Sequence, residues 1–326
     1  MRVGICSIQR NRGPWIREWV LFHYLLGVRY FYIGLHKTHD DSIETLRQLN
    51  LHINIKFFKV SDETYQAPQQ DFYQYTLDRF LHEVDWMAFI DQDEFLFSTK
   101  AKTLQAALQN FSHKKYSALG VYWKCFGSSG HVKEPEGLIL DNYKYRAPDD
   151  FKANRHVKSV VYTALADSTI RVSCVHRFET PLGTYDELGR FIAGGFSGLE
   201  PSYEHLRINH YVCQSREHFL KVKRPQGDGN RNVTKAADLR SEAWWEGHDR
   251  NEIQCDAIDQ FIPKLKALDQ AFLRGEVGEA RARDLRMPIS RRISFLSEMA
   301  ISFFHNRELT RSRFLGLSVK RINPKL

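Results

Sequence analysis

Apolar and polar positions alternate in two different rhythms along the first hundred residues. Short continuous apolar runs are typical of buried strands, whereas apolar residues spaced three and four apart are typical of helices packed on one face. The two patterns follow each other in turn, which predicts βαβ units on a mainly parallel sheet. The strands are expected at residues 3–8, 29–35, 53–60 and 86–90, and the helices at residues 15–26, 43–49 and 73–81.

The pattern beyond residue 100 predicts shorter elements. Helices are expected at residues 103–111, 215–222, 237–245 and 253–273, and strands at residues 118–123, 158–162, 170–176 and 206–212. Pro263 lies inside the last of these helices and is expected to kink or restart it. The sequence therefore predicts an α/β domain, residues 1–275, with a mixed, mainly parallel sheet flanked by helices, followed by a helical C-terminal tail, residues 276–326.

The apolar run at 87–90 ends in a cluster of carboxylates, Asp91, Asp93 and Glu94. Ligands of a parallel sheet collect beyond the carboxyl ends of its strands. Three acids so close together repel one another unless a cation shares them, and Mg²⁺ and Mn²⁺ prefer such oxygen ligands together with a substrate phosphate. Asp91 and Asp93 therefore indicate a metal-assisted nucleotide-diphosphate site. A solvated acidic turn after a strand fits the same residues equally well.

Polar loops elsewhere supply candidate partners for this site. A helix follows the first loop, and the backbone amides at its start favour an anion. The candidates are Arg10 and Arg12 for a nucleotide, Asp40 or Asp41 for a base or ribose, Lys158 and Lys223 for phosphate, His131 for a sugar or phosphate, and His210 as a further metal ligand. Each has an alternative without function, such as a surface loop, a charge at a helix end or a buried core histidine.

Charge and cysteine usage narrow the class of protein. The formal net charge is +8, and the segment 281–326 alone holds eleven Lys and Arg against three acids, so the basic character belongs to the tail. The five cysteines are widely spaced, which argues against a disulfide framework or a structural zinc site. No secretory leader and no apolar run of about 18 residues is apparent. We therefore expect a cytoplasmic protein.

An ordered set of short motifs resembles the family-92-type glycosyltransferases, which are nucleotide-sugar enzymes with the GT-A fold and are similar to glycosyltransferase family 2. The likeness extends over roughly residues 3–270. The motifs lie at residues 10–19, 23–33, 91–95, 123 with 126–131, 157–159, 209–211, 215–219 and 249–252. The resemblance implies a GT-A-like sheet for the main domain.

The resemblance also implies roles for individual residues. Asp91, Asp93 and His210 would bind Mn²⁺ or Mg²⁺. The candidates for the catalytic base of such a transfer are Asp249, Glu252, Glu200 and Glu204, of which Asp249 and Glu252 lie in the last motif. The nucleotide sugar would be bound by Arg10, Asn11, Asp41, Lys158, Lys223 and His131. One departure concerns Arg12, because such families usually carry a Lys-Asn-Glu triplet where this chain has Arg10-Asn11-Arg12. The missing acid puts the contacts to the nucleotide base in doubt.

These observations lead to one main hypothesis and two rivals. The main hypothesis is a metal-dependent, inverting transfer of a sugar from a nucleotide-diphosphate donor to a hydroxyl of a glycan or a lipid-linked saccharide. The rivals are a different metal-dependent nucleotidyl- or phosphotransferase, and a non-catalytic carbohydrate-binding relative. The basic tail is expected to contact the inner face of a membrane peripherally; packing on the domain or on a second subunit is the alternative.

Overall fold

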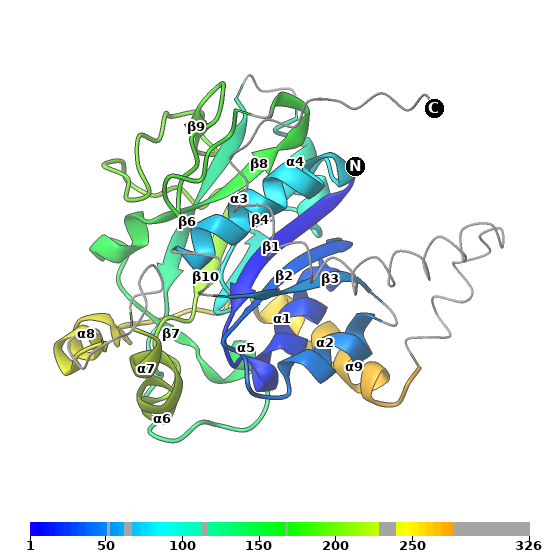
Figure 1. Ribbon diagram of the computed structural model, residues 1–326. Coiled ribbons are helices and arrows are strands. Elements are labelled where there is room, and N and C mark those ends of the chain that lie inside the picture. Colours follow the sequence, from blue (N-terminus) through cyan, green and yellow to red (C-terminus); the bar gives the residue numbers. More distant parts are fainter. Residues whose placement is uncertain (51–52, 62–66, 113–115, 167–168, 228–238, 277–326) are drawn as a thin grey trace, which may run out of the picture.

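A curled nine-stranded sheet forms the centre of the molecule (Figure 1). The computed structural model describes residues 1–50, 53–61, 67–112, 116–166, 169–227 and 239–276. The strand order is β3-β2-β1-β4-β8-β6-β10-β5, and β9 pairs with β6. The sheet strands are β1 (Val3–Gln9), β2 (Tyr30–His36), β3 (Asn54–Val60), β4 (Trp86–Phe89), β5 (Glu94–Ser98), β6 (Ala118–Cys125), β8 (Val157–Tyr162), β9 (Thr184–Tyr185) and β10 (Leu206–His210).

Helices are distributed around this sheet. The helices are α1 (Gly13–Leu25), α2 (Ser42–Asn50), α3 (Pro68–Phe80), α4 (Leu104–Gln109), α5 (Ile139–Asn142), α6 (Arg216–His218), α7 (Arg224–Gln226), α8 (Glu242–His248) and α9 (Ile262–Leu273). A π-helical segment, Phe219–Lys223, joins α6 to α7. A separate two-stranded sheet pairs β7 (Tyr145–Arg146) with β11 (Ile253–Gln254).

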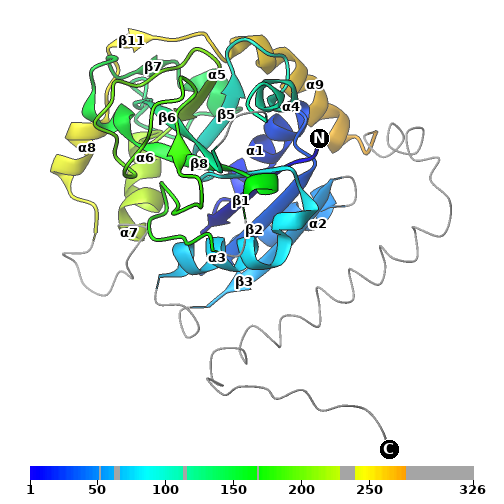
Figure 2. The same ribbon diagram turned by 90° about the horizontal axis from the view of Figure 1, so that it is seen from above.

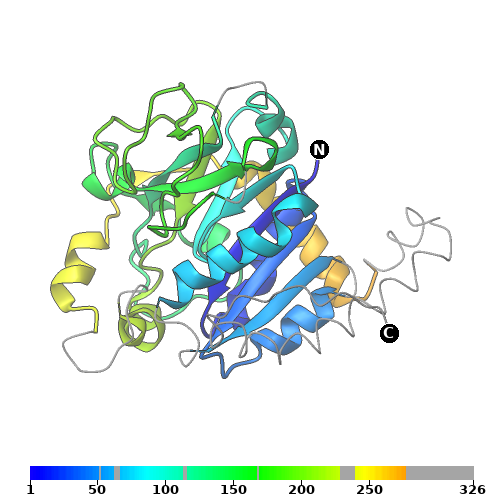
Figure 3. The same cartoon turned by 45° about the horizontal axis from the view of Figure 1, so that its top comes forward.

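The first four strands form the parallel half of the sheet, and both of its faces are buried. Successive side chains of a strand point to opposite faces. On β1, Val3 and Ile5 accordingly join the core under α1, whereas Cys6 packs with Phe72 and Tyr73 of α3. Figures 2 and 3 show α3 on one face of the sheet and α1 with α9 on the other. This double burial explains the continuous apolar runs of these strands.

The second half of the sheet is mixed. β8 runs antiparallel to both β4 and β6, β10 runs parallel to β6, and β5 closes the edge antiparallel to β10. The predicted mixed, mainly parallel α/β sheet is thus confirmed. No helix among the described residues is long and apolar enough to cross a membrane.

Two of the predicted elements are wrong. Residues 170–176 form no strand: Arg171 makes a single antiparallel bridge to Glu179, and Ile170 and Val175 pack against the α3 face of the sheet instead of extending it. The helix expected at 253–273 begins only at Ile262, because Pro263 occupies its first turn, where a missing N–H costs nothing. Ile253 and Gln254 pair with β7 instead.

Other predicted boundaries shift by a few residues. The helix expected at 73–81 begins earlier, at Pro68, and that expected at 215–222 is divided into α6 and the π-helical segment. The start of the helix expected at 237–245 and the tail beyond residue 276 lie outside the described residues.

Candidate functional site

A tight turn between β4 and β5 presents the two aspartates singled out by the sequence. Glu94, the first residue of β5, organises this turn and is fully buried. Its carboxylate Oε2 accepts the Asp91 N–H at 2.9 Å, and its own N–H donates to the Asp91 carbonyl at 3.1 Å. The chain reverses over four residues, so Asp91 and Asp93 both lie beyond the carboxyl end of β4.

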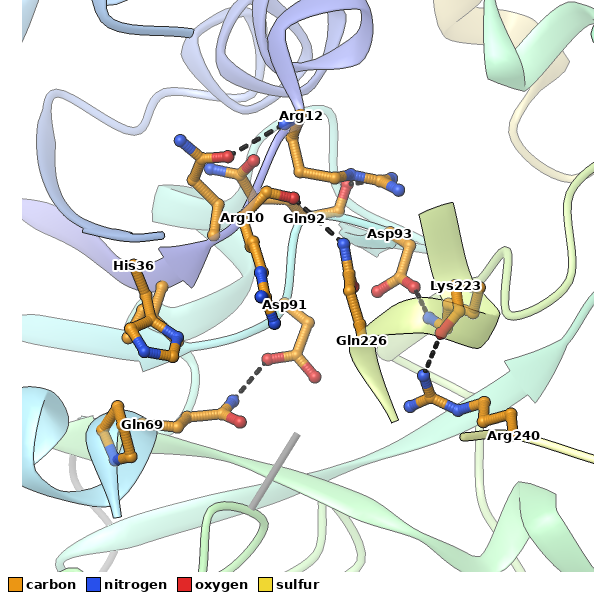
Figure 4. Close-up of a pocket in the computed structure, with 13 residues that line it drawn as sticks. Arg10, Arg12, His36, Gln69, Asp91, Gln92, Asp93, Lys223, Gln226 and Arg240 are labelled. Carbon is orange, nitrogen blue, oxygen red and sulfur yellow. Dashed lines mark hydrogen bonds and ion pairs between the residues drawn. The ribbon is translucent and has the colours of Figure 1, made fainter. Parts of the chain in front are cut away.

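A pocket of about 150 Å³ opens beside this turn. It lies at the carboxyl ends of β1, β2 and β4, beyond which α7 and the π-helical segment are seen in Figure 1. Figure 4 shows the side chains around it. The pocket is lined by Ile8, Gln9, Arg10, Arg12, His36, Pro68, Gln69, Asp91, Gln92, Asp93, Lys223, Gln226 and Arg240. Four cationic side chains therefore share one cavity with two carboxylates. The excess of positive charge favours an anionic ligand, even with the two carboxylates present.

Asp91 is held by a network that comes from the floor of the sheet. Lys158 of β8 is completely buried and donates to Asp91 Oδ2 at 2.8 Å, while Gln69 of α3 donates to Oδ1 at 2.7 Å. Burial on its own would raise the pKa of Asp91, but Lys158 outweighs it and lowers the pKa overall. Burial also raises the pKa of Glu94 well above its usual range. Lys158 thus favours the ionised form of Asp91, whereas burial favours the protonated form of Glu94.

Asp93 faces the opposite side of the turn. Its Oδ2 accepts from the ammonium of Lys223, and its Oδ1 lies 3.7 Å from His210 Nε2 at the end of β10. Burial would raise the pKa of Asp93, but Lys223 and then His210 outweigh it and hold this pKa well below its usual range. Burial lowers the pKa of His210, so its ring is neutral near pH 7 and retains a lone pair for a ligand.

Arg12 adds a further positive charge to the side chains around Asp93. Its side chain is only 6% exposed, and it contacts His218 Nε2 at 3.0 Å and stacks over Trp15, with 4.9 Å between the guanidinium carbon and the ring centroid. Burial lowers the pKa of Arg12, and among the surrounding carboxylates Asp93 does most to raise it again. Arg12, which stands where the resemblance led us to expect an acid, is therefore a fixed cation in the pocket wall.

The two loops expected to contact the nucleotide are tied to each other. Asn11 Oδ1 accepts the His39 N–H at 2.8 Å, and Asp40 Oδ2 accepts the Gly13 N–H at 2.7 Å at the start of α1. A Cβ on Gly13 would meet Asp41 Oδ1 at 1.7 Å, so any other residue there would displace the Asp41 side chain. Of the predicted nucleotide contacts on these loops, Arg10 lines the pocket, whereas Asn11 and Asp41 do not.

The other predicted residues lie outside the pocket lining. Asp249 is bonded to the loop after β6: its Oδ1 accepts the Ser128 N–H at 2.6 Å, and Asn251 donates to the same oxygen at 2.8 Å. Glu252 pairs with Arg250 at 2.6 Å. His131 packs edge-on to Tyr143, with 5.5 Å between ring centroids. These contacts give each residue a structural partner outside the pocket lining.

Several pocket residues were not predicted. His36, Gln69, Gln92, Gln226 and Arg240 line the pocket. Gln92 lies within the motif at 91–95 but was given no role there, and the other four belong to no motif that the sequence singles out. Gln226 Nε2 donates to the Arg10 carbonyl at 3.1 Å, and Arg240 donates to the Lys223 carbonyl at 2.7 Å. The only available signal was position, because His36 ends β2 and Gln226 follows the basic run at 221–224.

Within the part of the chain that the structure describes, no group of three or more His, Cys, Asp or Glu side chains is gathered closely enough to hold a metal ion. The geometry brings Asp93 and His210 together, while the oxygens of Asp91 are bonded to Lys158 and Gln69. The predicted three-residue metal set therefore stays a prediction.

Comparison with known proteins decides the family. The sequence model described as "Glycosyltransferase family 92" matches residues 2–181, more than half of the chain. The chain belongs to glycosyltransferase family 92. The family and the enzyme class expected from the sequence motifs are thereby confirmed.

Curated relatives give the same assignment. A glycosyltransferase family 92 protein of Oryza sativa subsp. japonica is 29% identical over 220 residues, which cover 66% of this chain and 34% of the relative. A family 92 protein of Ricinus communis is also 29% identical over 220 residues, covering 66% of this chain and 36% of the relative. The chain thus spans about a third of the length of the curated relatives it matches.

Solved structures show only a partial likeness. S. aureus TarS 1–349 in complex with UDP superposes with a TM-score of 0.34 and 15% identity, over 51% of this chain and 48% of that one. Glucosyl-3-phosphoglycerate synthase from Mycobacterium tuberculosis, in complex with Mn²⁺, UDP and phosphoglyceric acid, gives a TM-score of 0.33 and 11% identity, over 52% of this chain and 58% of that one. Similarity at this level bears on neither the chemistry nor the substrate of this chain.

Proposed function

We propose that this protein transfers a sugar from a nucleotide-diphosphate donor to a hydroxyl of a glycan or a lipid-linked saccharide, with inversion at the anomeric carbon and with the help of Mn²⁺ or Mg²⁺. The observation that carries the proposal is the pocket beyond β1 and β4, where Asp91 and Asp93 share one cavity with Arg10, Arg12 and Lys223. Family membership supplies the reaction class.

The charges of the pocket suit a diphosphate. Lys223 and Arg12 lie on the Asp93 side, and Arg10 reaches the cavity from the loop after β1 (Figure 4). When the bond between the anomeric carbon and the diphosphate breaks, its electron pair leaves an additional negative charge on the departing oxygen. Cations fixed where this charge develops stabilise the transition state without having to reorganise. Lys223 and Arg12 are held by buried contacts and meet this requirement.

The chemistry of the donor set fits a divalent cation on the Asp93 side. The Oδ1 oxygen of Asp93 and the Nε2 nitrogen of the neutral His210 ring lie 3.7 Å apart, and both atoms are of the kind that Mn²⁺ accepts as ligands. Asp93 and His210 would hold the ion, with Asp91 completing the acid pair. When bound, the ion would neutralise charge on the departing diphosphate as a Lewis acid.

The buried Lys158 has a positioning role in this proposal. Burial on its own would lower its pKa, but Asp91 and then Glu94 raise it overall, so the ammonium stays charged. It lies 2.8 Å from Asp91 Oδ2 and 3.5 Å from Glu94 Oε1. Lys158 therefore fixes the turn that carries the acids and is itself absent from the pocket lining.

Asp249 and Glu252 remain the candidates for the general base that deprotonates the acceptor hydroxyl. Neither belongs to the pocket lining, and each has partners near to it in the sequence. Peripheral contact of the tail with a membrane, and a cytoplasmic location, also stay predictions, since the tail lies outside the described residues.

A donor panel tests the proposed function. The protein is incubated with Mn²⁺ and a series of UDP- and GDP-sugars, and the released products are separated. Release of UDP or GDP from at least one donor is expected. Release of pyrophosphate instead would favour a nucleotidyltransferase, and no release together with no nucleotide binding would favour a non-catalytic relative.

A further inference from the structure

A wall of ring side chains continues from the acid pair toward the surface, on the side away from the nucleotide pocket. We call Trp123, His156, His176 and Phe196 the ring wall. Trp123 stacks on His156 with 4.9 Å between centroids, and His176 lies 5.2 Å from each of them. Phe196 approaches His156 edge-on at 5.1 Å. None of the four lines the nucleotide pocket.

The ring wall is connected directly to the site. Trp123 lies 4.2 Å from the ring of His210, centroid to centroid, and His210 Nε2 lies 3.7 Å from Asp93 Oδ1. The sheet explains this arrangement. Trp123 and His210 lie toward the carboxyl ends of the parallel strands β6 and β10. His156 directly precedes β8, which runs antiparallel to β6. All three residues therefore lie at the same end of the sheet strands as Asp91.

The backbone holds the outer part of the wall in place. His156 and Phe196 form an antiparallel bridge, flanked by hydrogen bonds from the Val157 N–H to the Gly195 carbonyl at 3.0 Å and from the Ser197 N–H to the Arg155 carbonyl at 2.9 Å. A Cβ on Gly195 would meet His176 Cβ at 2.6 Å, so glycine permits the close approach. Phe196 is nevertheless 50% exposed.

The composition of the wall suits a saccharide. Aromatic rings with an apolar face and a polar edge are suited to ligands that are apolar on one side and wet on the other, and a pyranose presents C–H groups on a face and hydroxyls around its rim. The neutral His156 ring donates from Nδ1 to the Ala153 carbonyl at 3.0 Å, so its Nε2 is left as an acceptor. No described residue donates to that nitrogen.

Trp123 is only 8% exposed and lies behind the other rings, so Phe196 and the rim of His156 form the accessible end of the wall. We propose that this end of the ring wall binds a pyranose ring of the acceptor saccharide, an inference that rests on the proposed function. The nucleotide pocket lies on the β1–β2 side of the acids, and the wall lies on the β6–β10 side. In an inverting displacement, the attacking hydroxyl approaches the anomeric carbon opposite to the departing diphosphate. An acceptor sugar seated on the wall approaches from that opposite side.

Saturation-transfer NMR with methyl α- and β-hexopyranosides tests this inference, with UDP and Mn²⁺ present. At least one pyranoside is expected to receive saturation on its ring C–H protons from the wild-type protein. Phe196→Ala should weaken its binding roughly 2- to 10-fold, as expected for losing one aromatic contact. Phe191→Ala is the matched control, because Phe191 is similarly exposed (53%) and contacts Tyr185 rather than the wall.

Calorimetric titration of the same three proteins with UDP, and with GDP where UDP does not bind, separates the two proposals. An unchanged nucleotide affinity together with a weakened pyranoside signal in Phe196→Ala supports the wall as an acceptor site. The inference is overturned if no pyranoside is saturated by the wild type, if Phe196→Ala and Phe191→Ala behave alike, or if Phe196→Ala weakens nucleotide binding as well. Failure of the wild type to bind either nucleotide contradicts the proposed function itself.

Discussion

Two turns of this molecule carry aspartates that the sequence singles out, one as metal ligands and the other as a candidate general base, and their surroundings in the structure differ. In the turn after β4, Asp91 and Asp93 are matched by lysines from distant parts of the chain and line a cavity. In the turn after α8, Asp249 accepts bonds from Ser128 and Asn251 and fixes one loop to another.

The difference lies in the partners of the carboxylates. Backbone and amide donors satisfy Asp249, which reduces its capacity to bind a ligand. A lysine ammonium donates to one oxygen of Asp91 and to one oxygen of Asp93, and Gln69 donates to the other oxygen of Asp91. Both aspartates still border the pocket. We propose that a carboxylate that borders a cavity and is balanced by a buried ammonium can still bind a ligand. A carboxylate bonded to neighbouring N–H groups mainly holds two loops together. The following substitutions test this distinction.

The largest effect is expected from Asp93→Asn. The substitution removes one carboxylate charge between Lys223 and His210, and we expect donor turnover to fall by a factor of ~100 or more, as for the loss of a group that organises transition-state charge. The measurement is release of UDP or GDP from the active donor. Asp149→Asn is the control, because Asp149 pairs with Lys124 and Arg146 outside the pocket. If Asp93→Asn turned over the donor at nearly the wild-type rate, the proposed difference between the turn after β4 and the turn after α8 would be wrong.

Lys223→Met is expected to have the next largest effect. It removes a charged donor to the diphosphate, which corresponds to roughly 10- to 100-fold weaker nucleotide binding. Binding of Mn²⁺ should not weaken, because Asp93 loses a competing cation. Calorimetry with UDP or GDP and, separately, with Mn²⁺ measures both quantities. Parallel loss of both affinities would indicate that Lys223 merely supports the local fold.

Asp249→Asn should affect stability more than binding. The new amide has only one oxygen to accept the bonds that Ser128 and Asn251 now donate to the carboxylate. We therefore expect the free energy of unfolding to fall by about 1–2 kcal/mol. Nucleotide affinity should stay unchanged. Urea unfolding and calorimetry measure the two effects. If stability is unchanged but turnover falls and the basic limb of its pH profile disappears, Asp249 acts as the general base after all.

The smallest effect is expected from Glu252→Gln. Glu252 is exposed and pairs only with the neighbouring Arg250, and exposed ion pairs of this kind contribute about 0–1 kcal/mol. The free energy of unfolding should remain near that of the wild type. A large loss of turnover without loss of stability would instead identify Glu252 as the base.

The fold was predictable from the sequence where local pattern decides it. The buried parallel strands β1 to β4 appear as apolar runs, and Asp91 and Asp93 follow the last of them. β5 was not predicted, because Phe95, Leu96 and Phe97 continue the apolar run directly after the acids. The reversal of the chain depends on Glu94 as a buried side chain, and no periodicity shows this.

The site was predictable only in part, because its ion pairs join residues far apart in the sequence. Lys158 lies 67 positions from Asp91, and Lys223 lies 130 positions from Asp93. The sequence marks these lysines as candidates for phosphate but carries no sign of their carboxylate partners. The ring wall depends in the same way on the neighbouring strands β6, β8 and β10, whose pairing is long-range.

Calorimetric titration of UDP and GDP, in the presence of Mn²⁺, into the wild-type protein and into Asp93→Asn tests the central claim most directly. The account predicts that the wild type binds at least one of the two nucleotides and that Asp93→Asn binds it at least ~10-fold more weakly. Equal affinity of the two proteins, or no binding to the wild type, would contradict it.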